Sequence, residues 1–171
     1  CDFTWMADMK LEFTSLATVV LRTCETRGLK VCTVESCTGG LVAASLTEIP
    51  GSSSVFERGF NTYSNHAKME MVNVSKDTLI AHGAVSVETA REMATGGLAA
   101  SRADLSVAIT GIAGPGGAGD KPEGLVCFAA ASKTGELVDA REEFGAIGRS
   151  NVRAFSVEKA LQMLLDLAQG K

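Results

Sequence analysis

Three short segments of the sequence carry side chains that could perform chemistry. In the first, residues 35–40 read Glu-Ser-Cys-Thr-Gly-Gly. Ser36 is a potential nucleophile, and the small residues after it allow the backbone to approach a ligand. Free N–H groups at the start of the next helix could hold an anion or an oxyanion. Because Ser and Thr before a helix are also common N-caps and Cys37 adjoins Ser36, this segment alone fixes neither a role nor a nucleophile.

The second segment, residues 63–68, reads Tyr-Ser-Asn-His-Ala-Lys and contains the only tyrosine of the chain. In a helix that begins here, Ser64 and Lys68 lie one turn apart on one face, with Tyr63 at the entrance. A lysine whose pKa is lowered by burial can act as a general base toward a serine. The same pattern also fits a solvated helix lysine beside a core tyrosine.

The third segment, residues 110–119, is rich in glycine and contains a formal Gly-x-Gly-x-x-Gly pattern. A dinucleotide-binding fold needs a helix on that loop, whereas residues 120–122, Asp-Lys-Pro, lead into a strand. The spacing to Lys121, with no Ser or Thr after it, also excludes a Walker loop. What remains is a loop rich in N–H donors, which could line a phosphate or ribose pocket or could be a surface excursion.

The elements that must position these segments follow from hydrophobic periodicity. Helical spacing predicts helices at residues 11–27, 41–46, 64–71, 87–103 and 150–168. Short apolar or alternating runs predict strands at residues 29–34, 56–63, 105–110, 125–131 and 137–144. This alternation indicates an α/β layered sheet, and a hairpin near residue 135 makes the sheet mixed. Ligands of such sheets bind at the carboxyl ends of the strands, where the first and third segments lie.

Composition restricts the class of protein. The chain has 171 residues, 46% of them hydrophobic, with 16 basic and 20 acidic side chains. We assign one domain to residues 11–171 and interpret residues 1–10 as a disordered segment or an extension. The lack of a Lys/Arg cluster argues against nucleic acid as a partner. No apolar run approaches the roughly 20 residues of a membrane-spanning helix.

Cysteine and histidine usage bears on compartment and metal binding. The five cysteines are widely spaced without a Cys-x-x-Cys pair, and the chain has two histidines. We therefore expect reduced core thiols in a cytoplasmic protein, and neither a disulfide framework nor a metal site.

Taken together, these segments resemble the C-terminal domain family of the competence-damage-inducible protein A (CinA), whose stand-alone members are nicotinamide-nucleotide amidases. The matching segments, in family order, are residues 35–40, 50–53, 56–60, 63–65 with Lys68, 82–86, 110–115 and 121–122 before Gly124. The resemblance implies a three-layer α/β/α sandwich with a mixed, mostly parallel sheet, in a homodimer. It also implies hydrolysis of nicotinamide mononucleotide, a small pyridine nucleotide, to nicotinate mononucleotide and ammonia, without a metal or another cofactor.

The resemblance also implies catalytic roles by position. Ser36 would attack the substrate carboxamide, Lys68 would be its general base, and Tyr63 would orient the lysine or relay the proton. This agrees with the residue chemistry, since a neutral hydroxyl needs a nearby base. We expect backbone N–H groups around Thr38 and Gly39 to hold the oxyanion, each typically contributing about 3 kcal/mol.

The 5′-phosphate of such a substrate requires a separate anion site. Thr110, Gly111 and the following glycine loop are candidates, together with Arg149 or Arg153 near the start of the last helix. An arginine fork fits phosphate oxygens, and a helix N-terminus adds its dipole. We favour Arg149 slightly, and a solvated helix face is the alternative for both arginines.

Two residues depart from the family pattern. Asn61 replaces a more usual apolar residue, and we expect it to alter the packing beneath Tyr63. Glu123 interrupts a Lys-Pro-apolar-Gly pattern, and we expect its negative charge to lie near the phosphate end. Neither departure removes a proposed catalytic group.

Two other functions are compatible with the sequence. The glycine loops and Arg149 could serve a non-catalytic nucleotide-binding or regulatory module. Residues 50–60 could instead be the contact surface of a structural partner of another enzyme. The choice among mononucleotide, riboside and free nicotinamide depends on pocket depth and stays open.

Overall fold

The computed structural model describes residues 4–171, and within them the strands form one sheet in the order β2-β1-β3-β4-β5. Their bounds are β1 (Val31–Glu35), β2 (Phe56–Asn61), β3 (Leu105–Gly111), β4 (Leu125–Ser132) and β5 (Leu137–Glu143). β1 pairs in parallel with β2 and β3, while β4 is antiparallel to both β3 and β5. Four of these five strands therefore point the same way, which confirms the mixed, mostly parallel sheet. Gly135, with φ of 107°, lies in the predicted turn between β4 and β5.

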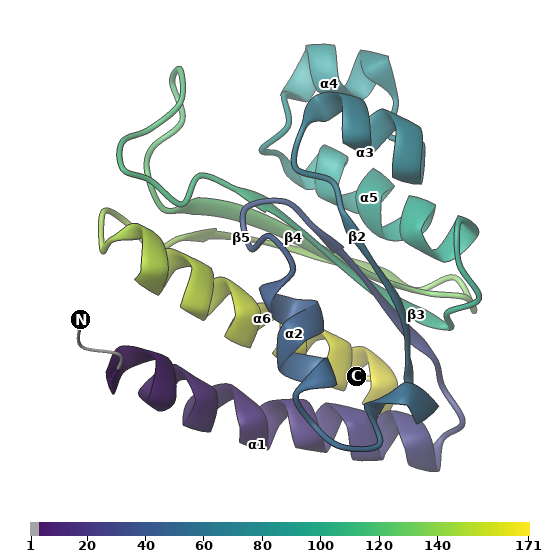
Figure 1. Ribbon diagram of the computed structural model, residues 1–171. Helices are drawn as coiled ribbons and strands as arrows, with labels where there is room; N and C mark the ends of the chain where they lie inside the picture. The colour runs from purple at the N-terminus through teal and green to yellow at the C-terminus, as the bar shows by residue number, and fades with distance from the viewer. Residues whose placement is uncertain (1–3) are drawn as a thin grey trace.

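Helices cover both faces of the sheet (Figure 1). The layer on one face contains α1 (Thr4–Thr26), α2 (Leu41–Thr47) and α6 (Arg149–Gln169), and the layer on the other contains α3 (Asn65–Val72), α4 (Lys76–His82) and α5 (Val87–Ala99). This arrangement confirms the expected three-layer α/β/α sandwich. None of the described helices is long and apolar enough to cross a membrane.

The core has two parts, one on each side of the sheet. Along β3, Val107 and Ile109 belong to the cluster on the α1, α2 and α6 side, whereas Ala108 belongs to the cluster on the α5 side. In β4, Phe128 and Cys127 divide in the same way. Burial on both faces explains why these strands appear in the sequence as nearly continuous apolar runs.

The glycine pair in α5 permits close packing. A Cβ atom added at Gly96 would overlap the carbonyl oxygen of Val72, the last residue of α3, and one added at Gly97 would lie 2.5 Å from Val34 Cγ2 in β1. Glycine lowers helix propensity by about 1 kcal/mol relative to alanine. Here it lets α5 approach both β1 and α3, and it therefore helps to set the position of α3 above the sheet.

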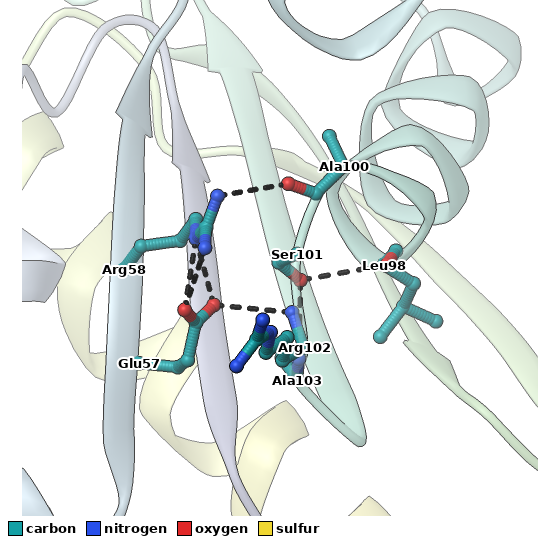
Figure 2. A network of polar contacts seen from close by, with 7 residues as sticks. All are labelled: Glu57, Arg58, Leu98, Ala100, Ser101, Arg102 and Ala103. Atoms are coloured by element: carbon teal, nitrogen blue, oxygen red, sulfur yellow. Dashed lines mark hydrogen bonds and ion pairs between the residues drawn. The ribbon is translucent and has the colours of Figure 1, made fainter.

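A polar network ties the edge strand β2 to the loop after α5 (Figure 2). Arg58 donates to the carbonyl of Ala100 at 3.1 Å, and the carboxylate of Glu57 accepts the N–H of Arg102 at 3.2 Å. Arg58 also pairs with Glu57 at 2.8 Å. The network lies at the amino end of β2, so it fixes the strand whose other end leads to α3.

The structure differs from the predicted elements in a few places. The sequence pattern did not reveal α4 or the short 3-10 helix η1 (Ser52–Ser54), because neither contains a buried side chain. Phe155 does not belong to the buried stripe of α6, since it is 48% exposed and stacks on Phe144. α5 ends at Ala99 and not at residue 103.

The first helix also starts earlier than expected. α1 begins at Thr4, upstream of residue 11. Residues 1–3 of the expected disordered segment or extension lie outside the described residues, so that domain boundary stays a prediction. Cys24, Cys32, Cys37 and Cys127 are free and buried, as expected of core thiols, while Cys1 lies outside the described residues.

Candidate active site

The loop that carries Ser36 is held by the buried side chain of Glu35, the last residue of β1. Glu35 accepts N–H groups of Val42 and Ala43 at 2.9 and 3.0 Å. These residues form the first turn of α2, whose N-cap residue, Gly40, provides no side-chain cap. A carboxylate at a helix N-terminus also interacts favourably with the helix dipole. Glu35 thus fixes both ends of the segment that contains Ser36, a role that the sequence analysis did not assign to it.

Lys68 lies beside Ser36, in the interior of the protein. Its side chain is 1% exposed, and its Nζ donates to Ser36 Oγ at 3.1 Å and to the Thr62 carbonyl at 2.8 Å. Burial lowers the pKa of Lys68 from 10.5 to about 8. A buried amine of this kind is neutral in a useful fraction of molecules near neutral pH, so it can accept a proton from a hydroxyl.

The position of Lys68 follows from the start of α3. Ser64 is the N-cap, and its hydroxyl accepts the N–H of Ala67 at 3.0 Å. Thr62, just after β2, donates its N–H to the Glu35 carbonyl at 2.8 Å, which aligns the start of this segment with the end of β1. The hydroxyl of Ser64 therefore serves the helix, whereas that of Ser36 contacts the amine.

Cys37, the other potential nucleophile, is 6% exposed. Burial raises the pKa of its thiol to about 12, so the thiol stays protonated at neutral pH. Because the thiolate is the reactive form of cysteine, Cys37 is a packing residue in this arrangement. Ser36 is the candidate nucleophile that the geometry favours.

Tyr63, the residue before the N-cap of α3, lies at the surface. Its side chain is 64% exposed, and its hydroxyl accepts a hydrogen bond from Arg149 Nη2 at 3.2 Å. Arg149, the first residue of α6, also donates through Nη1 to the Gly114 carbonyl at 2.9 Å. Tyr63 is therefore exposed and Lys68 is buried, which excludes the alternative of a core tyrosine beside a solvated lysine. Thr62, not Tyr63, contributes the backbone carbonyl that contacts Lys68.

Arg153, one helical turn further along α6, contacts the Ser36 loop directly. Its guanidinium donates to the carbonyls of Cys37 and Thr38 at 3.1 and 3.2 Å. The N–H of Gly39 is bound to the Ser36 carbonyl at 3.0 Å. Among the described residues, the fully buried Thr38 hydroxyl finds no hydrogen-bond partner.

The carboxyl end of β3 supplies the remaining predicted residues. The hydroxyl of Thr110 donates to the Ala84 carbonyl at 2.7 Å. A Cβ added at Gly111 would lie 2.8 Å from Val126 Cγ2, so this glycine permits close pairing with β4. In the structure both residues connect neighbouring segments beside the Ser36 loop.

A separate hollow of about 350 Å³ lies near the start of α5 and does not include Ser36 or Lys68. Among its lining residues, Lys121 donates through Nζ to the Val85 carbonyl at 2.6 Å, and His82 lies 3.7 Å from the carboxylate of Glu88. The described residues contain no group of three His, Cys, Asp or Glu side chains that could hold a metal ion.

Comparison with known proteins assigns the chain to a family. The sequence profile of the CinA C-terminal domain matches residues 13–168. The chain belongs to the CinA C-terminal domain family. The CinA domain is 50% identical to the nicotinamide-nucleotide amidohydrolase PncC of Escherichia coli, over 90% of this chain and 93% of that protein.

Solved structures agree with this assignment. The CinA domain is similar to the competence/damage inducible protein CihA from Agrobacterium tumefaciens, with a TM-score of 0.89, 48% identity and coverage of 91% of this chain and 94% of that one. A CinA superfamily protein from Escherichia coli gives a TM-score of 0.87 at 37% identity, covering 91% of this chain and 90% of that one.

The two departures from the family pattern both contact loops of the CinA domain. The side chain of Asn61 lies against Gly40, where an added Cβ would be 3.3 Å from Asn61 Nδ2. Asn61 therefore contacts the Ser36 loop from β2. Glu123 accepts the N–H of Gly116 at 2.8 Å, so its carboxylate contacts the glycine loop whose Gly114 carbonyl binds Arg149.

Proposed function

We propose that this chain is a nicotinamide-nucleotide amidase that hydrolyses the carboxamide of nicotinamide mononucleotide to give nicotinate mononucleotide and ammonia. The relative named nicotinamide-nucleotide amidohydrolase supports the substrate, at 50% identity over most of both chains. The observation that carries the chemistry is the 3.1 Å contact between Lys68 Nζ and Ser36 Oγ inside the protein.

In the proposed mechanism, neutral Lys68 takes the proton of Ser36 as the Ser36 oxygen attacks the carboxamide carbon. The resulting ammonium then gives this proton to the amide nitrogen, and the C–N bond breaks to release ammonia. The acyl group remains as an ester on Ser36. Water next attacks this ester, Lys68 accepts the proton of the water and returns it to the Ser36 oxygen, and nicotinate mononucleotide leaves. Dividing amide hydrolysis into these two steps lowers the barrier of each.

The Ser36 loop is also suited to stabilise the tetrahedral intermediate. We propose the N–H of Thr38 as an oxyanion donor, because that of Gly39 is already bound to the Ser36 carbonyl. Arg153 supports this role by holding the Cys37 and Thr38 carbonyls, which fixes the orientation of the intervening peptide groups. Preorganised donors of this kind are worth most when the loop cannot rotate.

Arg149 is the proposed phosphate ligand. It starts α6, where the helix dipole favours an anion, and its guanidinium lies at the surface between Tyr63 and the glycine loop. Tyr63 would then act through Arg149 and the substrate. A cytoplasmic homodimer that acts on a small nucleotide and binds no nucleic acid also stays a prediction.

The test is ammonia release by the purified protein, with a chelator present, from nicotinamide mononucleotide and from nicotinamide riboside. We expect turnover of the mononucleotide and much weaker turnover of the riboside, since Arg149 recognises the phosphate. Absence of ammonia from both, in a protein shown by circular dichroism to be folded, would refute the amidase and favour a nucleotide-binding module.

A further inference from the structure

The guanidinium of Arg149 makes two hydrogen bonds, and one of the acceptors belongs to the glycine loop, which the side chain of Glu123 contacts. Arg149 donates to the Gly114 carbonyl and to the Tyr63 hydroxyl. Gly114 has φ of +88°, and a Cβ added there would overlap the carboxylate of Glu123. The side chain of Glu123 therefore occupies the space beside Gly114, on the loop that carries one of the two acceptors.

The carboxylate of Glu123 also binds this loop directly. Its Oε2 accepts the N–H of Gly116 at 2.8 Å. Gly116 has φ of +79°, and a Cβ added there would meet no atom within 4 Å, so side-chain packing does not hold this residue in place. A hydrogen bond to a charged acceptor is stronger than one between neutral groups. Glu123 thus restrains the part of the loop around Gly116, while paired hydrogen bonds between Ala118 and Lys121 restrain the part that follows.

The backbone of Glu123 is in turn fixed by its neighbours. The next residue, Gly124, donates its N–H to the Ile112 carbonyl at 2.8 Å, and the Ile112 N–H binds the Leu125 carbonyl at 2.8 Å. These two bonds close the base of the glycine loop where β3 ends and β4 begins. Glu123 therefore extends from a rigid base and holds the loop through its carboxylate.

From this chain of contacts we propose that Glu123 is a positioning residue: by fixing the Gly114–Gly116 backbone, it keeps the Gly114 carbonyl where it orients Arg149 toward Tyr63 and the substrate phosphate. The proposal rests on the amidase function above. It assigns the effect of Glu123 to the geometry of the loop and not to repulsion between its charge and the phosphate.

Steady-state kinetics separate these two effects. Glu123→Ala removes the acceptor and is expected to raise KM for nicotinamide mononucleotide about tenfold, with a smaller effect on kcat. Glu123→Gln keeps a carbonyl oxygen for the Gly116 N–H while losing the charge, and it is expected to restore most of the affinity. If charge repulsion were the effect, both variants would lower KM. Asp120→Ala, which removes another carboxylate of the same connection, is the matched control and should leave KM unchanged.

A double-mutant cycle shows whether the effect passes through Arg149. Glu123→Ala is expected to raise KM much less in an Arg149→Ala background than in the wild type, because the guanidinium that it positions is gone. Equal effects in both backgrounds would overturn the proposal and leave Glu123 as a general stabiliser of the loop. Thermal unfolding of each variant checks that these comparisons are made on folded protein.

A measurement without substrate distinguishes failure of this inference from failure of the amidase. In ¹H–¹⁵N NMR spectra of the free protein, Glu123→Ala is expected to shift the Gly116 amide and the Arg149 Nε–H signals, and Asp120→Ala is expected to shift neither. An unchanged Arg149 signal would overturn the inference even if ammonia is released. If the Arg149 signal shifts but the protein releases no ammonia, the positioning role of Glu123 stands and only the amidase is refuted.

Discussion

Lys68 and Ser36 are 32 residues apart in the sequence, yet their Nζ and Oγ atoms lie 3.1 Å apart in the buried part of the site. Ser36 directly follows β1, and Lys68 lies in the helix that follows β2, the parallel neighbour of β1. The contact is therefore built from two adjacent strand ends. The Thr62 carbonyl is the second acceptor of the amine and fixes its direction.

The pH dependence of catalysis should report the pKa of Lys68. Because burial lowers this pKa to about 8, the base is mostly protonated at pH 6 and mostly neutral at pH 9. We expect log kcat/KM to rise with a slope near one below pH 8 and to level off above it. Lys68→Arg should be inactive, since a guanidinium stays charged. A profile that is flat from pH 6 to 9 would contradict the role of Lys68 as the base.

The same pKa shift should appear in protein stability. Lys68 binds its proton less tightly in the folded protein than in the unfolded chain, where its pKa is near 10.5. Unfolding therefore takes up a proton between about pH 8 and 10.5, and the free energy of unfolding should rise with pH in this window relative to Lys68→Met. We expect a gain on the order of 3 kcal/mol in urea titrations. Lys133→Met, at an exposed lysine, should show no such trend.

Substitution of the two adjacent candidates identifies the nucleophile. Ser36→Ala should reduce kcat by more than about 10³-fold, because no acyl intermediate can form. Cys37→Ala should retain turnover, since its thiol is protonated at neutral pH, although removal of a buried side chain should lower stability by roughly 1 kcal/mol. Mass spectrometry of rapidly quenched wild-type reactions should detect the acyl group on the peptide that contains Ser36. Loss of turnover in a folded Cys37→Ala variant would contradict this assignment.

The two arginines of α6 should have separable effects. Arg149→Ala is expected to raise KM for nicotinamide mononucleotide by about tenfold or more, with little effect on the riboside, which has no phosphate. Arg153→Ala should instead lower kcat for both substrates, because the guanidinium holds the Cys37 and Thr38 carbonyls of the Ser36 loop. If both variants raised KM for the mononucleotide equally and left KM for the riboside unchanged, Arg153 would also bind the phosphate.

Sequence reasoning predicted much of this fold because its main elements have strong patterns. The buried strands β3 and β4 are nearly continuous apolar runs, and Ser64 was a recognisable cap for α3. α4 was missed, because a seven-residue helix that packs on the core through the partly buried Leu79 and has no fully buried side chain leaves no periodic stripe.

The same reasoning found the side chains of the site more readily than their partners. The chemistry of Ser36 and Lys68 marked both as candidates, but the residue pattern placed Lys68 one helical turn from Ser64. The pairing of Lys68 with Ser36 came from the resemblance to the CinA family. Thr62 and the binding partners of Arg153 were not recognised, because these contacts use backbone carbonyls, which any residue type provides. The surface position of Tyr63 depends on where β2 ends relative to α3, a detail that periodicity does not resolve.

Gly96 in α5 offers a last test, because its close contact with Val72 helps to position α3, the helix that carries Lys68. Gly96→Ala should gain about 1 kcal/mol of helix propensity but lose more, since the new methyl group overlaps the Val72 carbonyl and overpacking costs roughly 1–3 kcal/mol. We expect α3 to move outward to relieve this overlap, which would admit water to Lys68 and raise its pKa. We therefore expect a lower Tm and a kcat/KM profile whose midpoint lies above pH 8. Thr95→Ala, whose hydroxyl binds carbonyls of its own helix, should change neither quantity. A Gly96→Ala profile identical to that of the wild type would show that α3 keeps its place, and that the closeness of α5 does not control the base.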